Sequence, residues 1–119
     1  MIGDKKISRA LFCFGVLAPF YEASTETRKQ LFDLLKEAYA DLGERFGVKV
    51  LATLDDDRFV VGPAENYPWT CYMLAEIPDV DAVTNVCNIL REVRVGDDLL
   101  WKYMRVEARI GRELFFGRT

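Results

Sequence analysis

Three charged residues near the end of the chain could bind and transform a ligand. Arg105, Glu107 and Arg109 alternate along one stretch, so on a β-strand their side chains would share a face. A guanidinium matches a carboxylate through two hydrogen bonds, which suits Arg105 or Arg109 to anchor an acidic ligand. Glu107 is the candidate for proton transfer, with a pKa governed by burial and the neighbouring arginines. The alternatives are a cross-strand ladder of ion pairs at an interface and a solvated strand end.

Aromatic residues supply a second candidate feature. Trp69 and Tyr72 follow a loop and lie three residues apart, and Trp101 precedes the charged stretch. Tryptophan and tyrosine each offer a flat apolar face with one polar tip, which suits an aromatic ligand held by stacking and one hydrogen bond. The alternative is that these rings fill the core or a dimer interface, where both residue types are enriched.

Several kinds of chemistry are excluded or disfavoured by residue type. The chain has no histidine, which removes Ser–His and Cys–His nucleophiles and the histidine-containing metal sites. Its three cysteines lack CxxC spacing and lie in apolar stretches, which indicates core residues rather than a disulfide framework or a zinc site. Asp55, Asp56 and Asp57 could bind a hard cation, but a polar turn is the expected structure. We expect no cofactor and no metal.

The elements that must position these residues follow from hydrophobic spacing. Residues 25–46 carry an apolar stripe at helical spacing, with Ser24 or Thr25 as the N-cap. A second helix begins after Asp79, which is placed to cap it. Gly15, inside the first strand, indicates a bulge or a close backbone approach. The expected strands are residues 9–17, 48–54, 69–77 and 99–110; on the last, Trp101 would share a face with Arg105 and Glu107.

This order predicts an α+β, ferredoxin-like βαββαβ domain with a four-stranded antiparallel sheet. Each helix has one apolar stripe, so both helices should cover the same sheet face and leave the other bare. An exposed face that carries aromatic residues indicates a partner, and a two-fold homodimer is the commonest arrangement. We therefore expect a sheet that pairs with a second copy of itself.

Bulk properties agree with one ordinary globular domain over residues 1–119, with residues 1–6 disordered. Half of the residues are apolar, 29% are charged and the net charge is −3. There is no concentrated basic patch, which argues against nucleic acid as a partner. We also expect no membrane association, because no apolar run approaches the ~20 residues needed to span a bilayer. The start has no apolar signal region, so the predicted location is the cytoplasm.

Several segments resemble the IacB-type small proteins of bacterial indole-3-acetic acid degradation. They are RALFCFG from Arg9, LDDD from Leu54, VGP from Val61, PWTCY from Pro68 and WKYMRVEARIG from Trp101. The resemblance spans most of the chain from Ile7 onward, and it extends to the broader dimeric α/β-barrel proteins. It implies a pocket between sheet and helices, sheets that pack together in a dimer, and an indole or other aromatic substrate. It supplies no catalytic residue.

Together these observations give a hypothesis for function. The protein would convert or bind an intermediate of indole-3-acetic acid degradation, a small aromatic molecule, without a cofactor. Glu107 would transfer a proton, Arg105 would bind a carboxylate, and Trp69, Tyr72 and Trp101 would line the pocket. The alternatives are a non-catalytic accessory subunit that assists a pathway enzyme and a protein that only sequesters its ligand.

Overall fold

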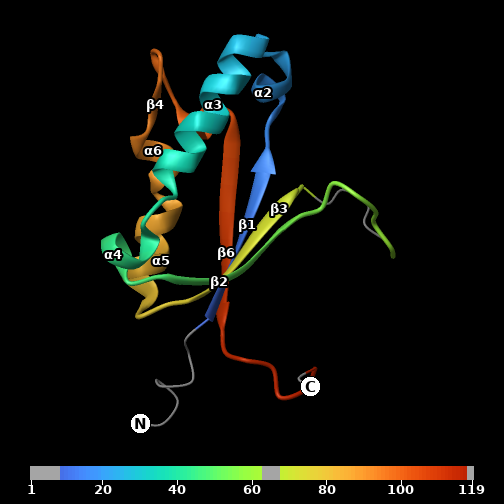
Figure 1. Ribbon diagram of the computed structural model, residues 1–119, viewed down its shortest axis with the longest axis vertical. Helices are drawn as coiled ribbons and strands as arrows, with labels where there is room; N and C mark the ends of the chain where they lie inside the picture. The colour runs from blue at the N-terminus through green and yellow to red at the C-terminus, as the bar shows by residue number, and fades with distance from the viewer. Residues whose placement is uncertain (1–8, 63–67, 118–119) are drawn as a thin grey trace.

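The computed structural model describes residues 9–62 and 68–117. It contains a four-stranded antiparallel sheet with the order β2-β3-β1-β6 (Figure 1). Together with the helices between β1 and β2 and between β3 and β6, this order is the predicted α+β, ferredoxin-like arrangement. The expected disorder of residues 1–6 lies outside the described residues. The strands are β1 (Arg9–Val16), β2 (Lys49–Asp55), β3 (Cys71–Glu76) and β6 (Met104–Gly111).

The helices lie on one side of this sheet, as expected (Figure 1). Both predicted N-caps are confirmed: the Ser24 side chain accepts from the Thr27 amide, and the Asp79 side chain accepts from the Ala82 amide. No helix in the described part of the chain has the length and apolar character to cross a bilayer. The helices are α2 (Ala18–Glu22), α3 (Thr25–Ala38), α4 (Leu42–Phe46), α5 (Val80–Cys87) and α6 (Ile89–Glu92).

The prediction of one helix over residues 25–46 is wrong, because the chain turns after Ala38. Asp41 adopts a left-handed backbone conformation with φ of 55°, and a separate short helix, α4, follows. Arg45 stabilises the break, since its Nη1 donates hydrogen bonds to the carbonyl oxygens of Ala38 at 2.6 Å and Ala40 at 2.9 Å. Carbonyl groups that a helix end leaves without partners are thereby satisfied.

The prediction of a last strand from residue 99 is also wrong. A two-stranded hairpin of β4 (Arg94–Val95) and β5 (Asp98–Leu99) comes first, followed by a 3₁₀ turn (Leu100–Lys102). Leu100 is fully buried, and its amide donates to the Val93 carbonyl at 2.8 Å, which anchors the turn. Strand alternation therefore begins only at Met104. Trp101 does not share a sheet face with Arg105 and Glu107.

The core lies between the sheet and the helices. On the central strand β1, Ala10, Phe12 and Phe14 face this side, and their neighbours on β3 and β6 belong to the same face. Helix side chains such as Leu31 and Val86 complete the layer. Phe12 is fully buried at its centre. Removing such a side chain from a packed core typically costs about 3–5 kcal/mol.

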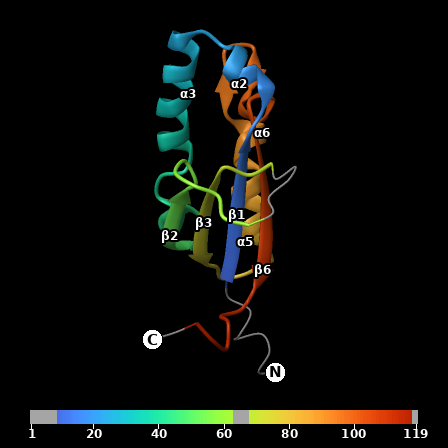
Figure 2. The ribbon, with the colours of Figure 1, turned by 90° about the vertical axis from the view of Figure 1, so that its right-hand side faces the viewer.

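The opposite sheet face has no helix over it, and we call it the bare face (Figure 2). Its middle is apolar and partly exposed, and its β6 side carries the alternating charges. The strand register places on it Leu11 and Cys13 from β1, Ala52 and Leu54 from β2, Tyr72 and Leu74 from β3, and Arg105, Glu107 and Arg109 from β6.

Gly15 is a point of close backbone approach, as its position in the sequence indicated. A Cβ at this residue would lie 2.5 Å from the Pro68 carbonyl oxygen and 3.3 Å from Trp69 Cε3. The backbone at Pro68 cannot rotate away as a flexible side chain would. The absence of a side chain at Gly15 thus lets Trp69 lie against the sheet.

We expect Gly15→Ala to lower the free energy of unfolding by about 1–3 kcal/mol, because the backbone must shift to admit the methyl group. Chemical denaturation followed by circular dichroism measures it. Gly111→Ala is the matched control, since Gly111 also lies in a strand but has no atom within 4 Å of an added Cβ. Equal stability of the two variants would contradict the close approach.

Candidate functional site

A cavity between α3 and the sheet is the strongest candidate site, and we call it the helix-side pocket. Its volume is about 290 Å³, close to the roughly 300 Å³ at which small-ligand pockets begin. Its wall is largely apolar, with five polar side chains among the described lining residues. The lining comprises Phe14, Leu35, Tyr39, Thr53, Leu54, Asp55, Cys71, Tyr72, Met73 and Met104.

Tyr39 is the most unusual residue of this pocket. Its hydroxyl oxygen is buried and makes no hydrogen bond within the described part of the chain. The ring is fixed by an edge-to-face contact with Phe14, with centroids 5.3 Å apart. Burial raises the pKa of the Tyr39 phenol well above its usual range, so the group is a neutral hydrogen-bond donor. A buried hydroxyl without a partner costs about 1–3 kcal/mol, and a ligand acceptor would remove that cost.

Two further polar groups define what the helix-side pocket can accept. Asp55, at the end of β2, is the only charged side chain among the described residues of the lining. Burial raises the pKa of the Cys71 thiol, so this group is neutral at ordinary pH. The pocket therefore offers one donor at Tyr39 and one acceptor at Asp55, and it has no cation to hold a carboxylate. This lining suits a flat apolar ring that carries an N–H group.

Sequence reasoning missed Tyr39 as a site residue. It occurs in the apolar stripe of the predicted helix, where it is one of several core-facing residues. A tyrosine in such a stripe must bring its hydroxyl to a partner or leave it unsatisfied. Whether the hydroxyl finds a partner depends on where the neighbouring helices and strands lie. The sequence alone therefore could not distinguish a satisfied hydroxyl from an unsatisfied one.

Most of the predicted site residues lie on or beside the bare face instead. The Arg105 guanidinium stacks on the Trp69 ring, 5.0 Å from its centroid. The Tyr72 hydroxyl donates to Asp56 Oδ2 at 3.1 Å and to the Trp69 carbonyl oxygen at 3.4 Å. The structure thus brings Trp69, Tyr72 and Arg105 together.

Glu107 lies two residues further along β6 and pairs with a neighbouring arginine. Arg109 Nη2 and Glu107 Oε2 are 2.6 Å apart. Both residues belong to β6, so this ion pair is not the cross-strand ladder considered for the charged stretch. Proton transfer by Glu107 and carboxylate binding by Arg105 stay predictions.

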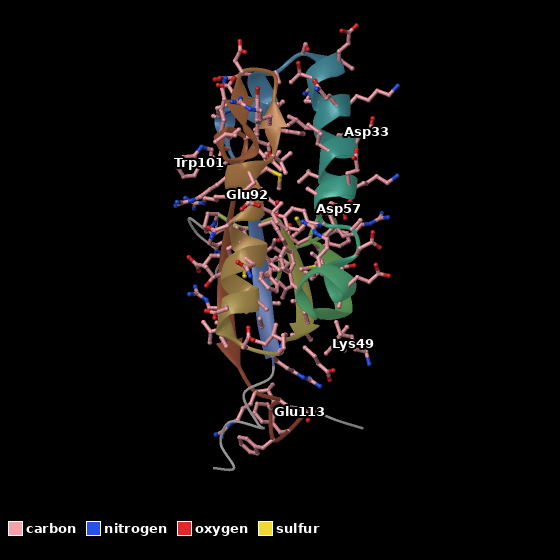
Figure 3. All side chains as sticks on the ribbon, turned by 90° about the vertical axis from the view of Figure 1, so that its left-hand side faces the viewer. Asp33, Lys49, Asp57, Glu92, Trp101 and Glu113 are labelled. Carbon is pink, nitrogen blue, oxygen red and sulfur yellow. The ribbon has the colours of Figure 1, made fainter. Side chains whose placement is uncertain are left out.

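Trp101 stacks with a different arginine. It is 50% exposed and projects at the edge of the molecule, where the Arg91 guanidinium stacks on its ring at 4.7 Å (Figure 3). It lines a smaller cavity beside α5 and α6, and Arg105 lines the same cavity. The 3₁₀ turn that carries Trp101 accounts for its absence from the bare face.

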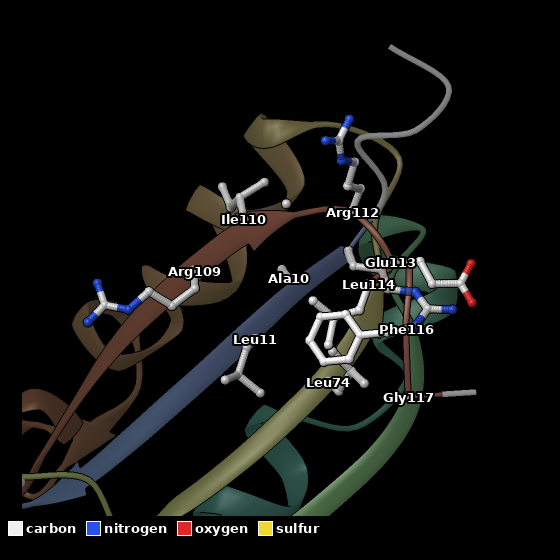
Figure 4. Close-up of a pocket in the computed structure, with 12 residues that line it drawn as sticks. Ala10, Leu11, Leu74, Arg109, Ile110, Arg112, Glu113, Leu114, Phe116 and Gly117 are labelled. Atoms are coloured by element: carbon white, nitrogen blue, oxygen red, sulfur yellow. The ribbon is translucent and has the colours of Figure 1, made fainter. Parts of the chain in front are cut away.

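Two further cavities lie on the bare face. A groove of about 330 Å³ is lined by Leu11, Leu74 and the β2 edge, and it shares Thr53, Leu54 and Tyr72 with the helix-side pocket. A second cavity, of about 420 Å³, forms where the segment after β6 turns back over the sheet. Figure 4 shows Phe116 of that segment over Leu11 and Leu74.

No group of three or more potential ligands in the described residues could hold a metal ion. The aspartates after β2 make other contacts: Asp56 accepts from Tyr72, and Asp57 lies 3.9 Å from Arg58 Nε. Cys13 is buried, and Cys71 and Cys87 are half-buried free thiols.

The sheet order and the one-sided helices define a class, the ferredoxin-like α+β fold. A solved structure described as "Putative Chlorite dismutase TA0507" has a similar fold, with a TM-score of 0.51 and 24% sequence identity. The similarity covers 90% of this chain and 45% of that chain, so this chain spans less than half of that protein's length. No protein-family model and no curated protein matches the sequence.

The buried Tyr39 hydroxyl should have a measurable effect on stability. Without ligand, we expect Tyr39→Phe to raise the free energy of unfolding by about 1 kcal/mol, because an unsatisfied polar atom is removed while the ring contact with Phe14 remains. The raised pKa keeps the phenol protonated in the folded chain, whereas the unfolded chain ionises near its ordinary value of 10.0. Wild-type stability should thus fall more steeply than that of Tyr39→Phe from about pH 9 to about pH 11.

Urea denaturation at a series of pH values measures both effects. The buried thiols also lose protons in this range, but they are common to both proteins, so the difference isolates Tyr39. If the free energies of unfolding of the two proteins changed equally with pH, the Tyr39 hydroxyl would not be buried in the folded chain.

Proposed function

We propose that this protein binds a small planar aromatic molecule of the indole type in the helix-side pocket, without a cofactor. One observation carries the proposal: an apolar cavity of suitable size is lined by Tyr39, whose buried hydroxyl has no partner among the described residues. An indole ring would supply apolar surface to Phe14, Leu35 and Met73 and an N–H group to Asp55. An oxygen on an oxidised indole would accept from Tyr39.

The resemblance to IacB-type proteins supports the same ligand class. We propose an intermediate of indole-3-acetic acid degradation as the ligand, and the cytoplasm as the place of action. Because Asp55 is the only charge in the lining, an acetate group would stay outside while the ring enters. The neutral ring system is therefore the part that the pocket selects.

We further propose that the protein acts as a homodimer, with its bare face as the contact surface. Its fold class supports this, and so do the apolar side chains in the middle of that face. Two-fold dimers are the commonest assemblies of such proteins.

Binding without conversion is favoured by the state of Glu107. Its carboxylate is held by Arg109 at 2.6 Å, and it does not line the helix-side pocket. This favours the ligand-binding or accessory role over catalysis. Proton transfer by Glu107 would require a ligand on the bare face, near Trp69 and Arg105.

Isothermal titration with indole, indole-3-acetate and oxindole tests the binding proposal. We expect the wild type to bind one indole per chain saturably and to bind indole-3-acetate more weakly. Tyr39→Phe should bind oxindole about tenfold more weakly than the wild type does, which is the value of one hydrogen bond. Tyr21→Phe is the matched control, since Tyr21 is 63% exposed and distant in sequence from the pocket lining. No saturable binding of any of the three compounds would overturn the proposal.

Glu107→Gln separates binding from catalysis. We expect this variant to bind indole as tightly as the wild type, because Glu107 lies outside the pocket lining. If the protein converts the compounds through Glu107, mass spectrometry should detect a product from the wild type and about 100-fold less from Glu107→Gln. That second result would favour the catalytic alternative.

A further inference from the structure

A cavity at the edge of the sheet has no part in the proposed function, and we call it the edge cavity. It lies where the edge strand β6 meets α5, α6 and the 3₁₀ turn, and its volume is about 220 Å³. Trp101 belongs to its lining and marks its place in Figure 3. Among the described residues, the lining contains two arginines, Arg91 and Arg105, and no acidic side chain. An excess of positive charge in a cavity attracts an anion.

A tryptophan ring holds each of these arginines. The Arg91 guanidinium lies 4.7 Å from the centroid of the Trp101 ring, and the Arg105 guanidinium lies 5.0 Å from that of Trp69. A guanidinium is planar, so a stacked one still directs its N–H groups outward in its own plane. Stacking therefore limits the motion of both side chains and uses none of their hydrogen-bond donors.

The charges of the two arginines are not neutralised by ion pairs within residues 9–62 and 68–117. Two acidic residues of the neighbouring strands have other partners: Asp98 pairs with Lys102 at 2.9 Å, and Glu107 pairs with Arg109 at 2.6 Å. Glu92 follows the first arginine in α6, but it does not belong to the lining. The edge cavity therefore keeps a positive charge that a ligand could compensate.

The rest of the lining indicates which anion fits. The Asn88 side chain, at the end of α5, adds an amide that can donate to an oxygen. Burial raises the pKa of the Cys87 thiol, so this group is neutral and does not repel an anion. Leu90, Met104 and Val106 supply apolar surface beside these polar groups. A ligand that combines an anionic group with a small apolar part suits this lining better than inorganic phosphate does.

We propose that the edge cavity binds the carboxylate of a small organic acid, with Arg91 and Arg105 as its anchors. Paired N–H groups of a guanidinium match the two oxygens of a carboxylate. The carboxylate binding expected for Arg105 thus gains a second anchor that the sequence did not indicate. Among the described residues, the linings of the edge cavity and the helix-side pocket share only Met104. The site therefore does not depend on the proposed binding of an indole.

Isothermal titration with benzoate tests the proposal, and benzamide is the neutral compound of nearly the same shape. At low ionic strength we expect one benzoate per chain to bind with a dissociation constant of about 1 mM or less. Benzamide should bind at least about tenfold more weakly, because it lacks the charge that the arginines compensate.

Substitutions locate the site. Arg91→Gln and Arg105→Gln should each weaken benzoate binding about tenfold or more, because each removes a charged hydrogen-bond donor. Arg91→Lys keeps the charge but not the paired donors, and it should weaken binding about threefold. Arg94→Gln is the matched control, since Arg94 is an exposed arginine of β4 outside the lining, and its loss should change the affinity less than twofold. All three arginines are exposed, so the variants should keep the wild-type circular dichroism spectrum.

Several results would overturn the proposal. They are no saturable binding of benzoate up to about 10 mM, equal binding of benzoate and benzamide, and an equal loss in the control variant, which would show a general effect of net charge. Inorganic phosphate that binds more tightly than benzoate would overturn the organic acid as the ligand. Competition between saturating indole and benzoate would place benzoate in the helix-side pocket instead. Benzoate binding in a chain that does not bind indole would overturn the proposed function and support the separate edge cavity.

Discussion

The packing of all helices on one side of the inner strand β1 is the constraint on which the rest of the structure depends. β1 pairs with β3 on one side and with β6 on the other, and it alternates fully buried residues such as Phe12 with residues of the bare face. A shift of one residue in this register would exchange the two faces. The helices must therefore cover one face completely. The other face then receives the partly apolar, partly charged side chains that the helices do not bury.

The helix-side pocket shows how the core provides a site at a local cost. The sheet and the helices bury Phe12 completely, but near Tyr39 they leave a cavity and a hydroxyl without a partner among the described residues. An apolar side chain at this position would have filled the gap without burying an unsatisfied polar atom. A buried polar atom without a partner is typical of a group that binds a ligand. The edge-to-face contact with Phe14 fixes the Tyr39 ring and so holds its hydroxyl in place.

The sequence predicted the elements whose signals are local. The helix spacing of α3, the caps at Ser24 and Asp79 and the close approach at Gly15 are all confirmed. The failures occurred where a side-chain or packing contact outside the periodic pattern decides the local structure. Arg45 satisfies the carbonyl groups that end α3, and the burial of Leu100 makes a turn from a stretch with strand-like alternation. Both interactions involve partners that periodicity does not reveal.

The amino-acid sequence by itself determined the fold class, because the order of elements and their one-sided apolar stripes allow few arrangements. It also determined which chemistry is absent, since a chain without histidine cannot supply histidine catalysis. Only the tertiary structure decided which side chains lie together. It paired Glu107 with Arg109, stacked Arg105 on Trp69 and placed Trp101 on a 3₁₀ turn outside the sheet. It also brought Tyr39 and Asp55 into the lining of one pocket and left the Tyr39 hydroxyl without a partner among the described residues, because both depend on how the helices pack against the sheet.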